Sequence, residues 1–259
     1  MNILVFDIET IPDINSGRKI FNLEGLNDKN VAELMFSYRY QQSDGRTEFL
    51  QHYLHQIVTI SVFLKTDDKL NIWSLGDKDS SEAELLKRFF EGIERYTPTI
   101  VSWNGSGFDL PVIHYRSLIH GVSSQRYWEN GDDDQSFRWN NYLSRFHSRH
   151  TDLMDVLSGY ITTARAPLNE IATILGFPGK MGMSGEKVWD YYLAGDIESI
   201  RNYCETDVLN TYLVYLRYQL IRGKLTNDLF IEECQKVRDM LKNERKTHLK
   251  EFLEVWKVG

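Results

Sequence analysis

The order of secondary-structure elements predicted near the N-terminus limits this chain to few folds. Runs rich in β-branched and aromatic residues predict strands, and apolar residues at helical spacing after a capping pattern at Ser81 predict a helix. The predicted elements are strands at 2–10, 57–64 and 70–75, a helix at 82–96, a strand at 99–103 and a helix from Pro111. This order predicts an α/β fold, a mixed sheet flanked by helices with the first strand central and the fourth beside it.

Two acidic residues, Asp7 and Glu9, stand at the end of the first predicted strand. Residues i and i+2 of a strand point to the same face, so the two carboxylates are expected side by side. Asp109 follows the fourth predicted strand, and ligands of such sheets bind at the carboxyl ends of strands. Asp207 adds a fourth carboxylate, and Mg²⁺ or Mn²⁺ would relieve the repulsion within such a group. Four carboxylates of this kind are the set that a two-metal nuclease needs.

Tyr203 and Asp207 lie in a stretch from Asp196 towards Tyr218 that is predicted to be helical. Their spacing of four puts both side chains on one helix face. Each motif has a plain interpretation when taken alone: acids often end strands, Asp109 is a helix cap, and Tyr203 with Asp207 is an ordinary helix face. The joint occurrence of all the motifs, in this order, favours a nuclease.

These motifs resemble those of the DEDD superfamily of 3′-5′ exonucleases, which have a ribonuclease H-like fold. The matching segments are Phe6–Thr10, Asn104–Asp109 and Tyr203–Asp207. Tyr203 lies four residues before the last acid, and Asn202 stands where another branch has histidine, so the chain resembles the tyrosine branch. More narrowly, it resembles predicted exonucleases related to the proofreading domain of family-B DNA polymerases, also through segments 23–26, 55–58 and 179–185. The resemblance implies a ribonuclease H-like mixed sheet of five strands.

The resemblance also implies hydrolysis of phosphodiester bonds at the 3′ end of single-stranded nucleic acid, with two Mg²⁺ or Mn²⁺ ions and release of nucleoside monophosphates. Asp7 would bridge the two ions. Glu9 and Asp207 would complete the site of the ion on the nucleophile side, and Asp109 would serve the other ion. Tyr203 would orient the attacking water, because a phenol with a pKa of about 10 is a poor base at neutral pH.

Contacts with the substrate are expected from five further residues: Thr10, Asn104, Phe108, Lys180 and Lys187. Phe108 would stack on a base, although a place in the core is nearly as well supported. The two lysines and the glycine-rich loop between them would hold phosphates, with a solvated turn as the alternative. Neither cysteine is in a CxxC pair, so Cys204 and Cys234 are expected to be reduced and structural.

The length of 259 residues favours one domain over 1–259, with 13–56 and 122–150 as insertions. A helix is expected around 31–38, a mobile segment or rim at 122–150, and mainly helices from 151 onwards, with cap signals near Asp152 and Asn169. The net charge of −7 counts against general nucleic-acid binding, but acids that bind metal contribute to it. No apolar run is long enough to cross a membrane and no signal-peptide pattern is present, so a cytoplasmic protein without membrane partners is expected.

Two other functions fit the same residues. One is a catalytically silent module that binds nucleic acid with the same fold, although the intact set of acids argues against it. The other is a two-metal phosphodiesterase that acts on dinucleotides, capped ends or short RNA. The resemblance to polymerase proofreading domains favours DNA over RNA, and a polymerase or a repair protein is a possible partner in trans.

Overall fold

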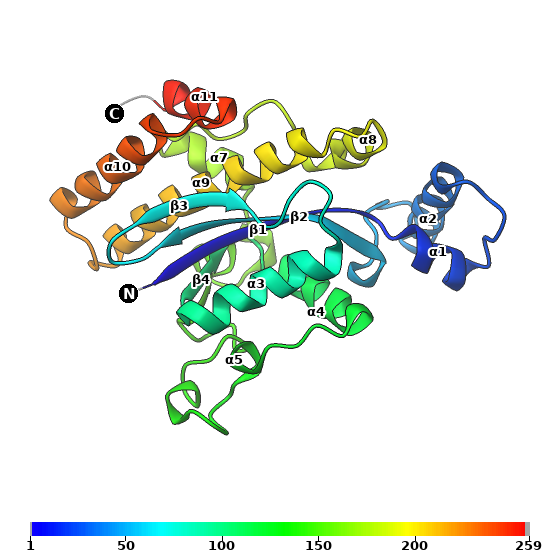
Figure 1. The fold of residues 1–259 in the computed structure, drawn as a ribbon, viewed down its shortest axis with the longest axis horizontal. Coiled ribbons are helices and arrows are strands. Elements are labelled where there is room, and N and C mark those ends of the chain that lie inside the picture. The colour runs from blue at the N-terminus through cyan, green and yellow to red at the C-terminus, as the bar shows by residue number, and fades with distance from the viewer. Residues whose placement is uncertain (1, 257–259) are drawn as a thin grey trace.

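The computed structural model describes residues 2–256, and its centre is a mixed sheet of five strands (Figure 1). The strands are β1 (Ile3–Pro12), β2 (His55–Lys65), β3 (Leu70–Ser74), β4 (Thr99–Ser102) and β5 (His150–Asp152). They lie in the order β3-β2-β1-β4-β5, with β2 antiparallel to β1 and β3, and with β1, β4 and β5 parallel. This confirms the expected ribonuclease H-like arrangement, with the first strand central and the fourth beside it.

Helices cover both faces of this sheet (Figure 1). One face carries α3 (Glu82–Tyr96) and α4 (Asp109–His120), with α5 (Gln125–Trp128) beyond them. The other face carries α7 (Leu168–Ile174), α9 (Ile197–Ile221), α10 (Asn227–Lys242) and α11 (Thr247–Val255). The shorter elements are α6 (Leu153–Leu157), α8 (Val188–Leu193) and the 3₁₀ turns η1 (His52–Leu54), η2 (Gln135–Phe137), η3 (Thr162–Ala164) and η4 (Gly185–Lys187).

The side chains of β1 alternate between the two layers. Ile3 and Val5 are buried in the layer that contains α9, whereas Leu4 and Phe6 are buried in the layer that contains α3. Because alternate residues of a strand share a face, Asp7 lies on the same face as Ile3 and Val5, towards α9. The alternation of side chains along β1 therefore places Asp7 on the face that α9 covers.

Residues 13–56 form two helices at one end of the sheet, α1 (Ile14–Phe21) and α2 (Asp28–Gln42) (Figure 1). They pack around a small core of their own that includes Val31 and Met35. The helix predicted around 31–38 is confirmed as α2. The sequence analysis did not predict α1, which is short and begins where Asp13 accepts a hydrogen bond from the Ser16 N–H at 3.1 Å.

The segment 122–150 holds α5 and η2, and it extends away from the sheet below α4 (Figure 1). Its aromatic residues Tyr127, Phe137 and Tyr142 are almost fully buried. The guanidinium of Arg149 lies 3.7 Å from the centre of the Phe137 ring. A packed core and cation–π contacts thus hold the segment to the rest of the fold.

Three details differ from the sequence prediction or refine it. Helix α4 begins at Asp109, two residues before Pro111. Asn169 is not a cap, because it lies inside α7, which follows Pro167. Asp152 does cap a helix, α6, but it also ends β5, a strand in a region predicted to be helical.

Within residues 2–256, no helix has both the length and the apolar character needed to cross a membrane.

Candidate active site

The first two acids lie near the carboxyl end of β1, on the face that α9 covers. The pairing of β1 with β2 shifts register between Glu9 and Thr10, directly after the second acid. Glu9 is buried and Asp7 is partly buried. Register shifts of this kind change the direction of side chains at the end of a strand. Here the shift lies between the two acids and the insertion 13–56.

The third acid reaches β1 from the turn that follows β4. Asp109 is 4 % exposed, and its Oδ1 accepts a hydrogen bond from the Ile8 N–H at 3.2 Å. This bond ties Asp109 to the backbone between Asp7 and Glu9. The plain interpretation of Asp109 as a helix cap is wrong, because Phe108 holds the cap position and makes no side-chain cap bond.

A carboxylate outside the four predicted acids, that of Asp152 at the end of β5, holds the turn 104–108 in place. Its oxygens accept hydrogen bonds from the Asn104 N–H at 3.0 Å and the Ser106 N–H at 2.8 Å. Asn104 has a left-handed backbone with φ of 65°, and its carbonyl accepts from the N–H groups of Gly107 and Phe108. A Cβ at Gly107 would lie 2.4 Å from the Asn104 Oδ1, so a larger residue there would displace the Asn104 side chain.

Helix α9 brings Tyr203 and Asp207 to the same place, as their spacing of four predicts. It begins at the Asp196 cap and contains both residues without interruption. Tyr203 and Asp207 lie close enough for each to affect the pKa of the other. The structure thus gathers all five predicted residues from β1, α4 and α9 at one edge of the sheet.

All four acids have raised pKa values. Burial, followed by the charges of neighbouring acids, raises the pKa of Asp7 and of Glu9 well above the ordinary values. Burial raises the pKa of Asp109 and of Asp207 to about 7, and the positive charge of Lys180 partly offsets this at Asp207. Within residues 2–256 none of the four acids forms an ion pair with a lysine, arginine or histidine.

Such a donor set fits divalent metal ions. Mg²⁺ and Mn²⁺ prefer oxygen ligands, and a bound cation would favour the charged form of these buried acids. The ligand atoms of Asp7, Glu9 and Cys204 lie within 4.8 Å of one another.

Cys204 is the residue of the site that the sequence analysis missed. It is fully buried, and its thiol contacts the Asp7 backbone oxygen at 3.4 Å and the Asp7 Oδ2 at 3.5 Å. Burial and the neighbouring carboxylates raise the pKa of this thiol, which keeps it neutral. Its place three residues before Asp207 puts both on one helix face, but that spacing alone does not distinguish a site residue from a core residue.

Tyr203 is a neutral phenol in this environment. Burial, then the charges of Asp207, Glu9 and Asp7, raise the pKa of Tyr203 above its ordinary value. Loss of its proton would add a fifth negative charge beside four acids. The hydroxyl is therefore a hydrogen-bond donor at neutral pH and is a poor general base.

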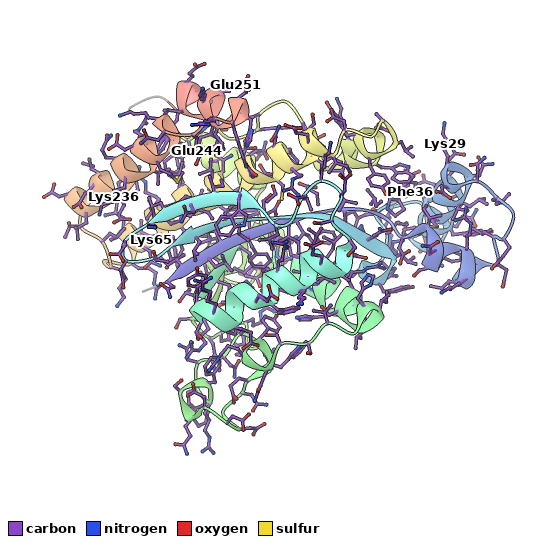
Figure 2. The ribbon with its side chains drawn as sticks, in the orientation of Figure 1. Lys29, Phe36, Lys65, Lys236, Glu244 and Glu251 are labelled. Atoms are coloured by element: carbon purple, nitrogen blue, oxygen red, sulfur yellow. The ribbon has the colours of Figure 1, made fainter. Side chains whose placement is uncertain are left out.

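A cavity of about 220 Å³ lies next to the acids and is here named the Glu9 cavity. Its lining includes Glu9, Thr10, Phe36, Phe49, Phe108 and Trp189. Phe36 belongs to α2 of the insertion 13–56, where Figure 2 labels it. The Thr10 hydroxyl lies 2.8 Å from His55 Nδ1, and burial lowers the pKa of His55 to about 4, so this histidine is neutral. Two predicted substrate contacts, Thr10 and Phe108, thus lie beside Glu9.

The other predicted substrate contacts are placed differently. Lys180 is exposed and close enough to Asp207 to affect its pKa. Lys187 is exposed in η4, next to Glu186, which lines the Glu9 cavity. Asn104 contributes its backbone to the turn before Asp109. Among the described residues, none of these three lines the Glu9 cavity.

The fold and the site define an α/β protein of ribonuclease H-like architecture with an acidic centre at the carboxyl edge of its sheet. The chain belongs to the family of predicted 3′-5′ exonucleases related to the exonuclease domain of PolB, whose model matches residues 47–256.

Similar proteins are DNA polymerases. The chain is 24 % identical over 209 residues to a DNA polymerase of Archaeoglobus fulgidus, an alignment that covers 72 % of this chain and 26 % of the polymerase. It is 51 % identical over 45 residues to the catalytic subunit of DNA polymerase epsilon from Saccharomyces cerevisiae, covering 17 % of this chain and 2 % of that protein. The family B DNA polymerase of Pyrobaculum calidifontis has a TM-score of 0.49 and 18 % identity, covering 85 % of this chain and 24 % of that one. The chain therefore spans about a quarter of the length of the archaeal polymerase that it matches.

Proposed function

We propose that this chain is a metal-dependent 3′-5′ exonuclease that removes nucleoside monophosphates from the 3′ end of single-stranded nucleic acid, with DNA favoured. One observation carries the proposal: Asp7, Glu9, Asp109 and Asp207 lie close enough at one sheet edge for their charges to affect one another, beside Tyr203, with no cationic side chain paired to them among residues 2–256. Membership of a family related to the PolB exonuclease domain supports the direction of cleavage.

The four acids would hold two divalent ions, Mg²⁺ or Mn²⁺. Asp7, the central acid, would contact both, Glu9 and Asp207 would complete one site, and Asp109 would serve the other. When bound, the two ions would supply a lowered pKa for the attacking water and stabilisation of the attacking and leaving oxygens. The bond from the Ile8 N–H to Asp109 holds that carboxylate close to the β1 backbone between the other two acids of the sheet.

Tyr203 would position the attacking water. Its phenol keeps its proton and lies close to Asp207, so a neutral hydroxyl stands beside the acids. Positioning is the role that a neutral donor can perform, whereas proton removal at neutral pH would need a group of lower pKa.

The Glu9 cavity would receive the terminal nucleotide. Phe108 packs against Phe49 and His55 and offers an aromatic surface to a base, while Thr10 presents its hydroxyl beside Glu9. A volume of about 220 Å³ suits one unpaired base better than a base pair, which favours a single-stranded end. Asn104, Lys180 and Lys187 would contact the strand outside this cavity, and a polymerase or repair protein would be a partner in trans.

The proposal is tested by the degradation of 5′-labelled single-stranded DNA and RNA oligonucleotides with Mg²⁺ or Mn²⁺. We expect a 3′-to-5′ ladder that a chelator and Asp7→Asn abolish. Asp190→Asn is the matched control, because Asp190 is an exposed acid of α8, and it should leave the ladder unchanged.

Each other outcome has a defined meaning. Cleavage that persists in Asp7→Asn would refute the proposed metal site. Strand binding without cleavage would instead support the silent module, and cleavage of dinucleotides alone would support the phosphodiesterase.

A further inference from the structure

A second cavity, of about 420 Å³, lies between α4 and the segment that follows it, and is here named the Trp128 cavity. Its lining includes Gly107, His114, Trp128, Leu143, Arg145 and Arg165. Figure 1 shows α4 and α5 on the same side of the sheet, with the chain of residues 129–150 extending below them. None of these residues belongs to the acidic site.

The Trp128 cavity and the acids lie at the same edge of the sheet. Strands β1, β4 and β5 are parallel, so their carboxyl ends point to one side. Gly107 lines the Trp128 cavity, the next residue, Phe108, lines the Glu9 cavity, and Asp109 follows. The turn 104–108 therefore separates two cavities that flank the acids.

The charge in the Trp128 cavity favours an anionic ligand. Asp155 is 2 % exposed at its side chain and pairs with both Arg145 at 2.9 Å and Arg165 at 2.7 Å. It is the one acid among the described residues that line the cavity, so two guanidiniums share one carboxylate. Arg145 is 46 % exposed at its side chain and is held 4.8 Å from the centre of the Tyr160 ring. A guanidinium fixed on one side and exposed on the other is suited to a phosphate.

An aromatic surface lies in the same cavity. Trp128 is 47 % exposed, although it packs against His114 and edge-on against Tyr127 with ring centres 4.9 Å and 5.3 Å apart. Tyr127 is 1 % exposed and hydrogen-bonds His114 at 2.8 Å. The buried pair thus supports Trp128 from behind. An exposed, supported ring beside an arginine is the combination that binds bases and backbone of single strands.

We propose that the Trp128 cavity binds the single strand upstream of its terminal nucleotide, with Trp128 stacked on a base and Arg145 on a backbone phosphate. This inference rests on the proposed function, because it requires the 3′ end of the strand at the acids. A strand whose last base enters the Glu9 cavity crosses the turn 104–108 to reach Trp128. The positive charge of the cavity and its position next to the acidic site therefore both favour a nucleic-acid strand as the occupant.

The test compares a substrate that has no upstream nucleotide with one that has several. The first is the p-nitrophenyl ester of thymidine 5′-monophosphate, and the second is a single-stranded octanucleotide. For Trp128→Ala and Arg145→Ala we expect kcat/KM on the octanucleotide to fall about tenfold, the scale of one lost stacking or phosphate contact. On the ester both variants should equal the wild type, and Trp128→Phe should recover most of the loss because it keeps a ring.

The matched controls are Trp139→Ala and Arg138→Ala. These adjacent residues of the same segment are exposed, their side chains lie 5.7 Å apart as a cation–π pair, and neither lines the Trp128 cavity. Both controls should leave the two substrates unaffected. A thermal unfolding curve for each variant identifies any loss that comes from misfolding.

The outcomes separate this inference from the proposed function. Equal losses on ester and octanucleotide, or no loss on either, would overturn the inference and leave the cavity to another occupant such as a protein segment. If the wild type hydrolyses neither substrate, the proposed function fails, and fluorescence anisotropy of a labelled octanucleotide then decides the inference alone. Weaker binding by the Trp128 and Arg145 variants but not by the controls supports it, and unchanged binding refutes it.

Discussion

Replacement of Arg116 by methionine should be among the most destabilising single changes outside the acidic site. Arg116 is 4 % exposed, and its guanidinium binds Glu82 through two hydrogen bonds of 2.7 Å and 2.5 Å and also binds Asp13. Glu82 in turn accepts from the Ile57 N–H at 2.6 Å and contacts His120 at 2.7 Å. One arginine thus joins α4 and α3 to the ends of β1 and β2.

The magnitude follows from what the change leaves behind. Methionine has a similar volume, so the cavity cost is small, but two acids would remain buried without their arginine. Removal of one partner from a buried ion pair costs about 3–5 kcal/mol, a large fraction of a total stability of about 5–15 kcal/mol. We expect a loss of that size in urea unfolding at pH 7.5. The loss should be smaller at pH 5, because Asp13, whose pKa Arg116 helps to lower, can take up a proton once the guanidinium is gone, which removes part of the uncompensated charge.

The control is Arg88→Met, which breaks an exposed i, i+4 pair with Glu84 at 2.7 Å on α3. Both side chains of that pair are more than 40 % exposed, so little or no change in stability is expected. A loss below about 1 kcal/mol in Arg116→Met would refute the reasoning. It would mean that the cost of burying the three charged groups nearly equals their mutual attraction, so that the cluster adds little net stability. A loss that does not change between pH 7.5 and 5 would refute the charge argument and leave packing as the cause.

Three further predictions concern Tyr203, the acids of the site and the buried Glu205. Tyr203→Phe should lower kcat on the order of 100-fold, through a misplaced water, and leave the affinity for Mn²⁺ measured by calorimetry unchanged. Asp109 and Asp207 have raised pKa values of about 7, so the metal-free protein should lose stability as pH rises from about 4 through 7; urea unfolding with and without Mg²⁺ should show the metal restoring it. Burial opposes ionisation of Glu205, but hydrogen bonds from His248 and Lys246 lower its pKa to about 2. The contribution of Glu205 to the free energy of unfolding is therefore present above about pH 4.3 and is lost as pH falls through 2. The difference in unfolding free energy between wild type and Glu205→Gln should shrink over that range, and a constant difference would contradict the assignment.

The parts of the structure that depend on local rules were predictable from the sequence. The period of two in β1 places Asp7 and Glu9 on one face, and the spacing of four in α9 pairs Tyr203 with Asp207. The position of Asp109 needed one further rule, that parallel strands end at the same edge of a sheet. These rules act within a few residues or on the order of elements, and both can be read from one chain.

The parts that depend on contacts between distant segments were not predictable. Strand β5 has three residues, too few for an alternating pattern, and it exists because it pairs with β4. The role of Cys204 depends on what α9 packs against, since its spacing alone is that of any core residue. Arg116 meets Glu82 and Asp13 across 34 and 103 residues, and nothing in the local pattern indicates either pair.

The turn 104–108 depends both on a local sequence motif and on a contact with a distant segment. Its residues matched a motif of the sequence, but its conformation depends on Asp152, which the sequence analysis treated as a helix cap. Asp152 accepts hydrogen bonds from the Asn104 and Ser106 N–H groups while it also caps α6 through Met154 and Asp155. Because the same turn starts α4 at Asp109 and separates the Glu9 cavity from the Trp128 cavity, the short strand β5 positions an acid of the site through this turn. A motif can therefore identify the residues of such a site, while their geometry depends on a strand that the motif does not include.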